Sequence, residues 1–441
     1  MQNKDVMGKG RILPLLIKFT LPATAAMAMN SLYNITDRIF VGNAVGKEGL
    51  SAITAVFPIT TFIMALSVLS GMGCSTLVAI RLGENDEKGA ISVLNHTIIY
   101  IVAAAGITSV LGVVFVKPVL LMLGITPELA EYASQYARII ISFSVFTYFA
   151  FGLNHTIRST GKPIIAMLTV LTGGIMNIIL DFVLVTKMRL GIIGAAWANG
   201  ISQGIASILV ILYFIKFSPI KISFKNFKFD IKQIFEIAKI GSAQSFMQFI
   251  TALISVLLNK TVVTVMSADG LASAGVYTSV VTLLTVPAMG ISQGTQSLIG
   301  YNYGADNKKR VVSFYYSATV LSVVATIIVV VLAEAFAPQL AGVFGKDVAL
   351  ASVWIRRGVF LLPLSAAVIV TSGYFQAKGK QGKALLAALL RQVIFYVPAL
   401  FVLPKLINNE GIMYAQPVSD LPTFVATAIL AIYDIRNYKR G

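Results

Sequence analysis

The sequence predicts an all-α integral membrane protein with twelve transmembrane helices. Its 441 residues are 57% hydrophobic and only 12% charged, and the mean hydropathy is +0.83. A soluble domain carries about 25% charged residues, so this composition excludes an ordinary soluble protein. The chain also contains twelve apolar runs of at least the roughly 20 residues needed to cross a bilayer. We expect these spans at 14–41, 50–80, 91–116, 129–153, 162–186, 192–217, 233–264, 271–300, 311–336, 350–376, 382–404 and 410–435.

The distribution of Lys and Arg predicts how these spans are oriented. The net charge is +17, which taken alone could suggest a nucleic-acid partner. However, most basic residues lie in alternate connectors, as expected for the cytoplasmic side of a membrane protein. The remaining connectors hold only Lys47, Lys117, Lys187, Arg189, Lys346 and Lys405. Topology therefore accounts for the charge, and we expect both termini to be cytoplasmic, with the bilayer rather than nucleic acid as the partner.

The two halves of the chain follow one plan. A shift of 221 residues aligns the connector "LGENDEKG" after the second span with "YGADNKKR" after the eighth, and "STGKPIIAML" resembles "AKGKQGKALL" at nearly the same offset. Because six spans is an even number, both halves enter the membrane in the same direction and form a parallel pseudo-repeat. We therefore predict a six-helix lobe at 1–218, a basic cytoplasmic linker at 219–232 and a second six-helix lobe at 233–441.

The motifs that the sequence lacks narrow the function. It contains no phosphate-binding G-x-x-x-x-G-K-[ST] loop and no H-E-x-x-H zinc motif. The single cysteine, Cys74, lies in an apolar stretch and is expected to pack as a small hydrophobic residue. Ion-coupled secondary transport by rocking of two lobes remains, so we expect a monomeric transporter that is not an enzyme and holds no cofactor.

Two carboxylates lie deep in the spans of the first half, Asp37 and Asp181. A charged group at such depth is costly, so it is a functional candidate by default. Residues three, four or seven apart share one face of a helix. The candidate cation-coupling residues are Asp37, Asn177, Asp181 and Asn199, with Asn30, Tyr33 and Asn34 as supporting polar groups.

This cluster would be suited to bind a proton or sodium, and no other metal site is expected. The amides could instead hold helices together through hydrogen bonds, and for Asn30 and Asn34 both interpretations stay open.

The second half does not repeat this chemistry at the same offset, because Asp37 aligns with Leu258. Its deep charged candidates are Lys260 and Glu334, near expected outer ends, and Arg391 inside the span 382–404. Ion coupling is therefore expected mainly in the first lobe. Arg391 could order the second lobe or face the cavity.

Two further features bear on movement and substrate. Pro22 interrupts the hydrogen bonding of the first span, which produces either a static kink or a hinge. Flexible and aromatic side chains could form an adaptable cavity wall, although each could equally face lipid or pack in the core. These candidates are Met27, Met64, Phe57, Phe246, Met247 and Met289.

Several stretches together resemble the multidrug and toxic compound extrusion (MATE) family of transporters, in particular a bacterial branch, over essentially the whole chain. They are "LYNITDRIFVG", "STGKPIIAMLTVLTGGIMNIILDFVLV", "GIIGAAWANGISQ" and "SLIGYNYGA". The resemblance implies a twelve-helix, two-lobe fold and antiport of drugs against protons or sodium.

The resemblance also assigns individual residues. Asp37 matches the family's acidic residue in the first span, while Asn177 and Asp181 match its pair in the fifth. Asn199 stands where many members have threonine, and Pro22 matches a proline around which bending has been proposed. Thr251 and its neighbours provide no carboxylate where one branch has one in the seventh span.

The expected function is therefore export of amphipathic, cationic drugs across a bacterial cytoplasmic membrane. The alternative within transport is a flippase for a lipid-linked saccharide, which would need cationic groups in the cavity for phosphate. A membrane-bound transferase is the alternative from another class, but the sequence shows no clustered metal or phosphate site for it.

Overall fold

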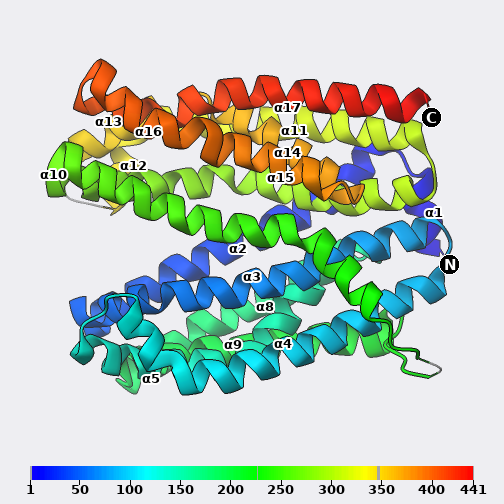
Figure 1. Ribbon diagram of the computed structural model, residues 1–441, viewed down its shortest axis with the longest axis horizontal. Helices are drawn as coiled ribbons and strands as arrows, with labels where there is room; N and C mark the ends of the chain where they lie inside the picture. The colour runs from blue at the N-terminus through cyan, green and yellow to red at the C-terminus, as the bar shows by residue number, and fades with distance from the viewer. Residues whose placement is uncertain (1, 226, 345–347, 441) are drawn as a thin grey trace. The chain divides into compact units, whose positions relative to one another are not determined.

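The computed structural model describes residues 2–225, 227–344 and 348–440, and these residues form helices and connectors without a strand (Figure 1). Ten helices in this part of the chain are long and apolar enough to cross a membrane, and there are up to twelve spans if two bent helix pairs each count as one. The expected all-α integral membrane fold is confirmed.

The chain divides into two compact units that exchange two segments. Unit 1 consists of Met1–Val6 and Ala25–Phe249, and unit 2 of Met7–Thr24 and Ile250–Gly441. The division expected from sequence lay in the linker at 219–232, so the contacts place the first part of the chain's long seventh span with unit 1. The first span is divided in the same way.

Unit 1 is a bundle in which long helices run side by side (Figure 1). Its complete elements are α3 (Lys47–Gly83), α4 (Glu87–Met122), α5 (Pro127–Ser142), α6 (Ser144–Thr147), η1 (Tyr148–Gly152), α7 (Leu153–Ser159), α8 (Pro163–Leu180), η2 (Asp181–Lys187), α9 (Gly191–Leu212) and η3 (Tyr213–Phe217).

Unit 2 is a second helical bundle with its own buried core around Trp354, Val359 and Leu400. Its complete elements are α11 (Lys308–Ala335), α12 (Ala337–Phe344), α13 (Val348–Val359), α14 (Leu362–Ala377), α15 (Gln381–Leu389), η4 (Leu390–Phe395), α16 (Tyr396–Ile407), η5 (Asn409–Tyr414) and α17 (Ala415–Arg440).

Three helices cross the boundary between the units. They are α1 (Gln2–Lys9), α2 (Ile12–Val45) and α10 (Ile231–Gly304). Pro22 lies inside α2, which continues through it, and the chain passes from unit 2 to unit 1 two residues later, between Thr24 and Ala25. The proline in the interior of α2, which cannot donate a backbone hydrogen bond, thus lies close to the point where the packing partners of the helix change.

The backbone differs from the expectation in three places. Helical backbone continues between the spans expected at 233–264 and 271–300, which are both parts of α10. The spans expected at 129–153 and 350–376 are each bent, by 51° near Phe143 and by 53° before Leu362. Pro363 lies in the first turn of α14, where a backbone N–H is not needed for the hydrogen bonds of the helix. A proline also disfavours helical backbone at the residue before it, and the preceding helix α13 ends before that residue.

The linker is anchored on α4 of unit 1. His96, which is fully buried, accepts a hydrogen bond from the Asp230 N–H at 2.9 Å and stacks against Phe229. Asn95 donates to the Ser223 carbonyl oxygen, and Ser92 donates to Gln233 at 2.7 Å. The basic linker is therefore held at both ends by polar side chains of one helix.

The start of the chain is anchored in unit 2. The Arg310 guanidinium donates to the carbonyl oxygens of Met7 at 3.1 Å and Gly10 at 2.9 Å. Asn302 donates to the same Met7 oxygen and accepts from Arg310 Nε. One arginine thus fixes the segment that leads into α2.

Candidate functional site

Asp181 and Asn177 form a buried polar pair in unit 1. Asn177 lies one turn before the end of α8, and Asp181 begins the π-helical segment η2. Their exposed fractions are 2% and 0%. Within the described residues, neither carboxylate oxygen of Asp181 and neither amide atom of Asn177 has a hydrogen-bond partner. Such groups are rare in folded proteins and commonly mark a functional site, and π-helical segments also concentrate at functional sites.

Asp37 of α2 faces Asp181. The two carboxyl groups interact electrostatically, and the phenol of Tyr136 on α5 interacts with both of them and with Tyr33. Two nearby carboxylates repel each other, so one bound cation can relieve the repulsion. The structure thus brings together the two acids that the sequence predicted. It adds Tyr136, an aromatic residue in an amphipathic helix that carried no sequence signal of this role.

A small cavity with both apolar and polar lining residues, Asn177 among them, lies inside unit 1. It has a volume of about 30 Å³, enough for one or two water molecules but not for a drug. Its polar lining comes from Asn30, Tyr33, Thr169, Asn177, Ser202 and Gln203. Oxygen atoms of amides and hydroxyls are suitable ligands for a hard cation, and several of them line the cavity.

Close packing of α2 against α8 positions these groups. A Cβ atom on Gly174 would lie 2.6 Å from Cε of Met29, so the helices approach more closely than any larger residue at 174 would allow without movement of the methionine. Gly173, next to it, lines the cavity. Gly174 therefore allows α2 to lie close against α8, whereas Gly173 faces Ala206 of α9.

The other predicted coupling residues have varied positions. Asn30 and Tyr33 line the cavity, as does Asn177, whereas Asn199 is half-buried and lies outside the set of lining residues. Instead of Asn199, the cavity is lined by Ser202 and Gln203, which lie on the next turn of α9. The side chain of Asn34 lies outside the described residues. The assignment of the four coupling residues stays a prediction.

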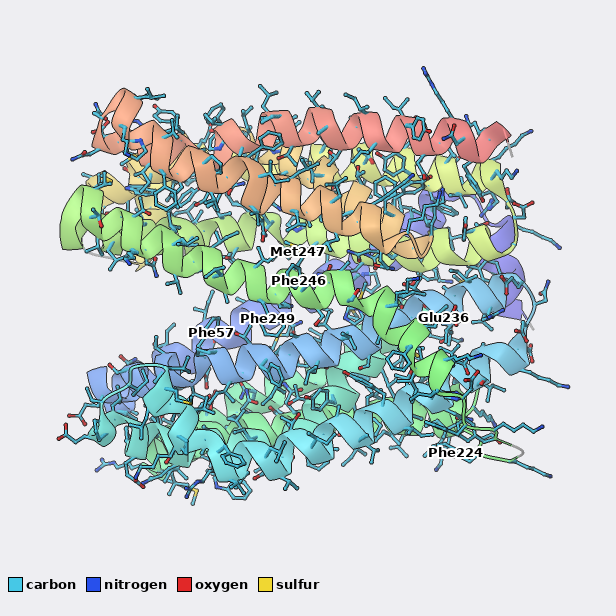
Figure 2. The ribbon with its side chains drawn as sticks, viewed as in Figure 1. Phe57, Phe224, Glu236, Phe246, Met247 and Phe249 are labelled. Atoms are coloured by element: carbon cyan, nitrogen blue, oxygen red, sulfur yellow. The ribbon has the colours of Figure 1, made fainter. Side chains whose placement is uncertain are left out.

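The proposed substrate-contacting residues are divided between the two units. Figure 2 shows Phe57 on α3 and Phe246 and Met247 on the part of α10 that belongs to unit 1. Phe57 is 47% exposed and Phe246 is 50% exposed. Met27 and Met64 are half-buried in the same unit, and the exposed Met289 belongs to unit 2.

Phe249 extends this aromatic surface of α10. Its ring lies 6.1 Å from that of Phe62 on α3. An apolar surface of this kind suits amphipathic compounds as well as lipid.

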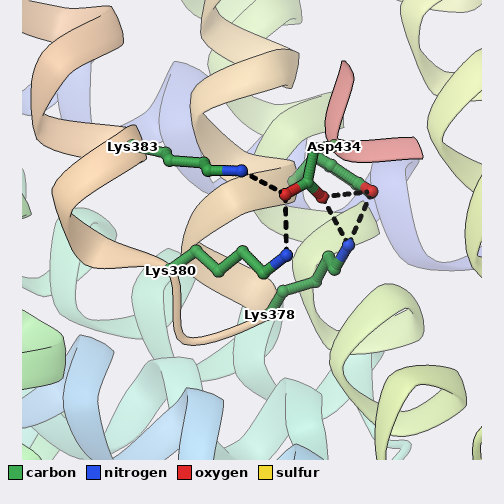
Figure 3. Close-up of polar contacts among 5 residues, drawn as sticks. Lys378, Lys380, Lys383 and Asp434 are labelled. Carbon is green, nitrogen blue, oxygen red and sulfur yellow. Dashed lines mark hydrogen bonds and ion pairs between the residues drawn. The ribbon is translucent and has the colours of Figure 1, made fainter. Parts of the chain in front are cut away.

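The sequence interpretation overlooked two buried acids of unit 2, Asp420 and Asp434, each 1% exposed. Both lie in the last expected span, where a carboxylate should have been noticed for the reason that singled out Asp37. Asp434 is surrounded by Lys378, Lys380 and Lys383 (Figure 3). Asp420 faces Arg391, so unit 2 also contains buried carboxyl groups, while the expectation that ion coupling lies mainly in the first lobe stays a prediction.

Comparison with known proteins identifies the family. A family model described as MatE matches residues 22–183 and 244–401, more than half of the chain. The chain belongs to the MatE family. The multidrug export protein MepA of Staphylococcus saprophyticus is 27% identical over 430 residues, 96% of this chain and 94% of that protein. MepA of Staphylococcus aureus is 26% identical over 434 residues, 97% and 95% of the two chains.

The MatE fold is also found in solved structures. One, described as the outward-facing conformation of a multidrug resistance MATE family transporter of the MOP superfamily, matches with a TM-score of 0.96 at 23% identity and covers 100% of this chain and 99% of that one. The predicted two-lobe, twelve-helix MATE architecture is thereby confirmed. This MatE chain is a multi-pass membrane protein.

Proposed function

We propose that this protein exports amphipathic, cationic compounds from the cell in exchange for protons or sodium. The MatE membership and the resemblance to MepA proteins support multidrug export. The observation that carries the coupling is the buried carboxyl of Asp181, which lacks a hydrogen-bond partner among the described residues and faces Asp37, while Asn177, one turn before it, lines a small cavity. Such a site gains stability when it takes up a cation.

The exchange follows from charge. When the site is open to the outside, a cation neutralises the pair formed by Asp37 and Asp181, and when it is open to the cytoplasm the cation leaves. A membrane potential contributes about 2.3 kcal/mol per 100 mV for each charge moved. Pro22, where α2 changes packing partners, is the proposed hinge between the two states.

The flippase alternative is less well supported by the cavity. A lipid-linked phosphate would require cationic side chains, and the lining that the structure describes contains amides, hydroxyls and apolar groups instead. The proposed location is the cytoplasmic membrane of a bacterium with both termini inside, since basic residues concentrate in the corresponding connectors.

The test is efflux of ethidium from bacterial cells that lack their own multidrug pumps. Cells with the native protein should exclude the dye, and cells with Asp37→Asn or Asp181→Asn should retain it at equal expression. Asp230→Asn, in the linker, serves as a matched control that removes a carboxylate elsewhere.

Two perturbations separate the coupling ions. Collapse of the proton gradient should stop efflux if protons drive it, and removal of sodium should stop it if sodium does. Full activity of Asp37→Asn and of Asp181→Asn would contradict the coupling site, whereas absence of efflux by the native protein would contradict export of this dye class.

A further inference from the structure

Asp420 of α17 lies inside unit 2, in contact with side chains of α14 and η4. Its Oδ1 atom accepts hydrogen bonds from Ser365 Oγ of α14 at 2.5 Å and from Gln416 Nε2 of its own helix at 2.8 Å. Arg391 of η4 places its Nε atom 3.8 Å from the same oxygen. With an exposed fraction of 1%, the carboxyl is removed from water.

The pair of Asp420 and Arg391 is incomplete as an ion pair. In the described part of the chain, neither Oδ2 of Asp420 nor Nε of Arg391 has a hydrogen-bond partner. A closed pair between a carboxylate and a guanidinium places its atoms at about 2.7–2.9 Å and often forms two parallel hydrogen bonds. One carboxylate oxygen of Asp420 is therefore buried without a hydrogen bond. A buried ion pair with a purely structural role is expected to have its remaining polar atoms hydrogen-bonded.

Among the described residues that interact with Asp420, one carries a positive charge. Arg391 is the cation, and the phenols of Tyr277 on α10 and Tyr396 on α16 are the other titratable groups that interact with the carboxyl. Both phenols are buried, and Ser365 and Gln416 are neutral. The charge of the whole cluster thus depends on whether Asp420 holds a proton.

The internal repeat relates this cluster to the cavity of unit 1. Gly161 and Gly379 both have positive φ angles, +83° and +69°, and each ends the turn that precedes a corresponding helix, α8 or α15. The same number of residues further on stand Gly173 and Arg391. Gly173 lines the cavity of unit 1. At this position of the repeat, the second half therefore has the cationic side chain of Arg391, whereas the first half has Gly173 and a cavity.

We propose that Asp420 is a second proton-exchange site of this transporter, with Arg391 as its tethered counter-charge. A proton binds at Oδ2 and makes the carboxyl neutral. When the proton leaves to water, the carboxylate remains and its charge is balanced by Arg391, so no other reactant is needed. The role of this site in transport rests on the proposed function, but its protonation can be measured without transport.

The experiment uses infrared difference spectroscopy of the full-length protein in lipid nanodiscs over a pH series. The observable is the carbonyl stretch of a protonated carboxyl group. The native protein should show a pH-dependent signal from a buried carboxyl that is completely lost in Asp420→Asn. The signal should be retained in the double variant Asp37→Asn/Asp181→Asn, which removes the acids of unit 1, and in Glu84→Gln, which removes an exposed carboxyl.

A second variant keeps the test decisive if Asp420→Asn does not fold. Arg391→Lys preserves the charge but replaces the planar guanidinium, so the balance between the two protonation states should change. The pH dependence of the Asp420 signal should then shift. Spectra of Asp420→Asn that match those of the native protein, or an unshifted signal in Arg391→Lys, would overturn the proposal.

The outcome is independent of the efflux experiment. If the native protein does not export ethidium but the Asp420 signal titrates as expected, the proposed function fails and the proton site stands. If efflux depends on Asp37 and Asp181 but Asp420 gives no titrating signal, the exporter stands and Asp420 is a structural ion-pair partner.

Discussion

Lys378 Nζ lies 2.6 Å from Oδ2 of Asp434, and the exposed fractions of the two side chains are 0% and 1%. Lys380 and Lys383 contact the other carboxylate oxygen, so three ammonium groups share one carboxylate (Figure 3). Burial lowers the pKa of Lys378 to about 8, although Asp434 acts in the opposite direction. The cluster joins the connector between α14 and α15, and the first turn of α15, to the last turns of α17.

Removal of the shared carboxylate should destabilise unit 2. In Asp434→Asn, the buried ammonium of Lys378 loses its counter-charge, and loss of one partner of a buried pair costs about 3–5 kcal/mol. Thermal unfolding of the purified protein in detergent should show a clear decrease in the melting temperature. Arg436→Gln, an exposed change in the same helix, is the control and should leave it nearly unchanged. Equal melting temperatures for the two variants would contradict the role assigned to Asp434.

Close packing of α10 against α3 should make Gly241 intolerant of substitution. A Cβ atom there would lie 1.7 Å from the Leu69 carbonyl oxygen, whereas one on Gly106 would have no atom within 4 Å. Gly241→Ala is therefore expected to destabilise the protein by at least the roughly 1–3 kcal/mol typical of overpacking. Gly106→Ala should be neutral or slightly stabilising, by up to about 1 kcal/mol. The yield of folded protein and its melting temperature measure the difference, and similar values for the two variants would show that the backbones separate at little cost.

The guanidinium of Arg310 should protect the start of the chain from proteolysis. It donates to the carbonyl oxygens of Met7 and Gly10, and a lysine cannot make the same pair of contacts from one planar group. Because a hydrogen bond from a charged group contributes about 1.5–3 kcal/mol, Arg310→Lys should increase the rate of trypsin cleavage after Lys9 or Arg11 about tenfold or more. Lys309→Gln, next to it and exposed, should leave the rate unchanged. An unchanged rate in Arg310→Lys would show that other contacts hold the segment.

Asp37 and Asp181 should behave as one unit in transport. Because their carboxyl groups face each other, each needs the other to hold the exchanged cation, so their effects should not add. Efflux by the double variant Asp37→Asn/Asp181→Asn should be no lower than that of the more impaired single variant. A double variant whose loss equals the product of the two single losses would indicate two independent sites.

Much of the fold could be predicted because the length of an apolar segment shows whether a helix can cross a bilayer. Apolar runs predicted the spans, and the offset between "LGENDEKG" and "YGADNKKR" predicted the repeat. The bends near Phe143 and before Leu362 were missed because a bent span has the same composition as a straight one. The continuous backbone of α10 was missed because a polar stretch between spans is also compatible with a helix.

The candidate site could be predicted in part. The cost of a buried charge singled out Asp37 and Asp181, and helix periodicity added Asn30, Tyr33 and Asn177, which line or adjoin the cavity. Tyr136 and Gln203 were not predicted, because nothing local distinguishes a tyrosine or glutamine that faces a cavity from one that packs elsewhere. The same cost argument, carried through the last span, would have found Asp420 and Asp434.

The sequence by itself determined the all-helical membrane fold, its repeat and the acids of the first half, because each follows from composition or from spacing along one helix. The tertiary structure alone decided which acids face which partners. It brought Asp37 from α2 to Asp181 of η2, placed Arg391 next to Asp420, and gathered three lysines around Asp434. These relationships depend on contacts between helices distant in sequence, and local periodicity carries no information about which faces meet.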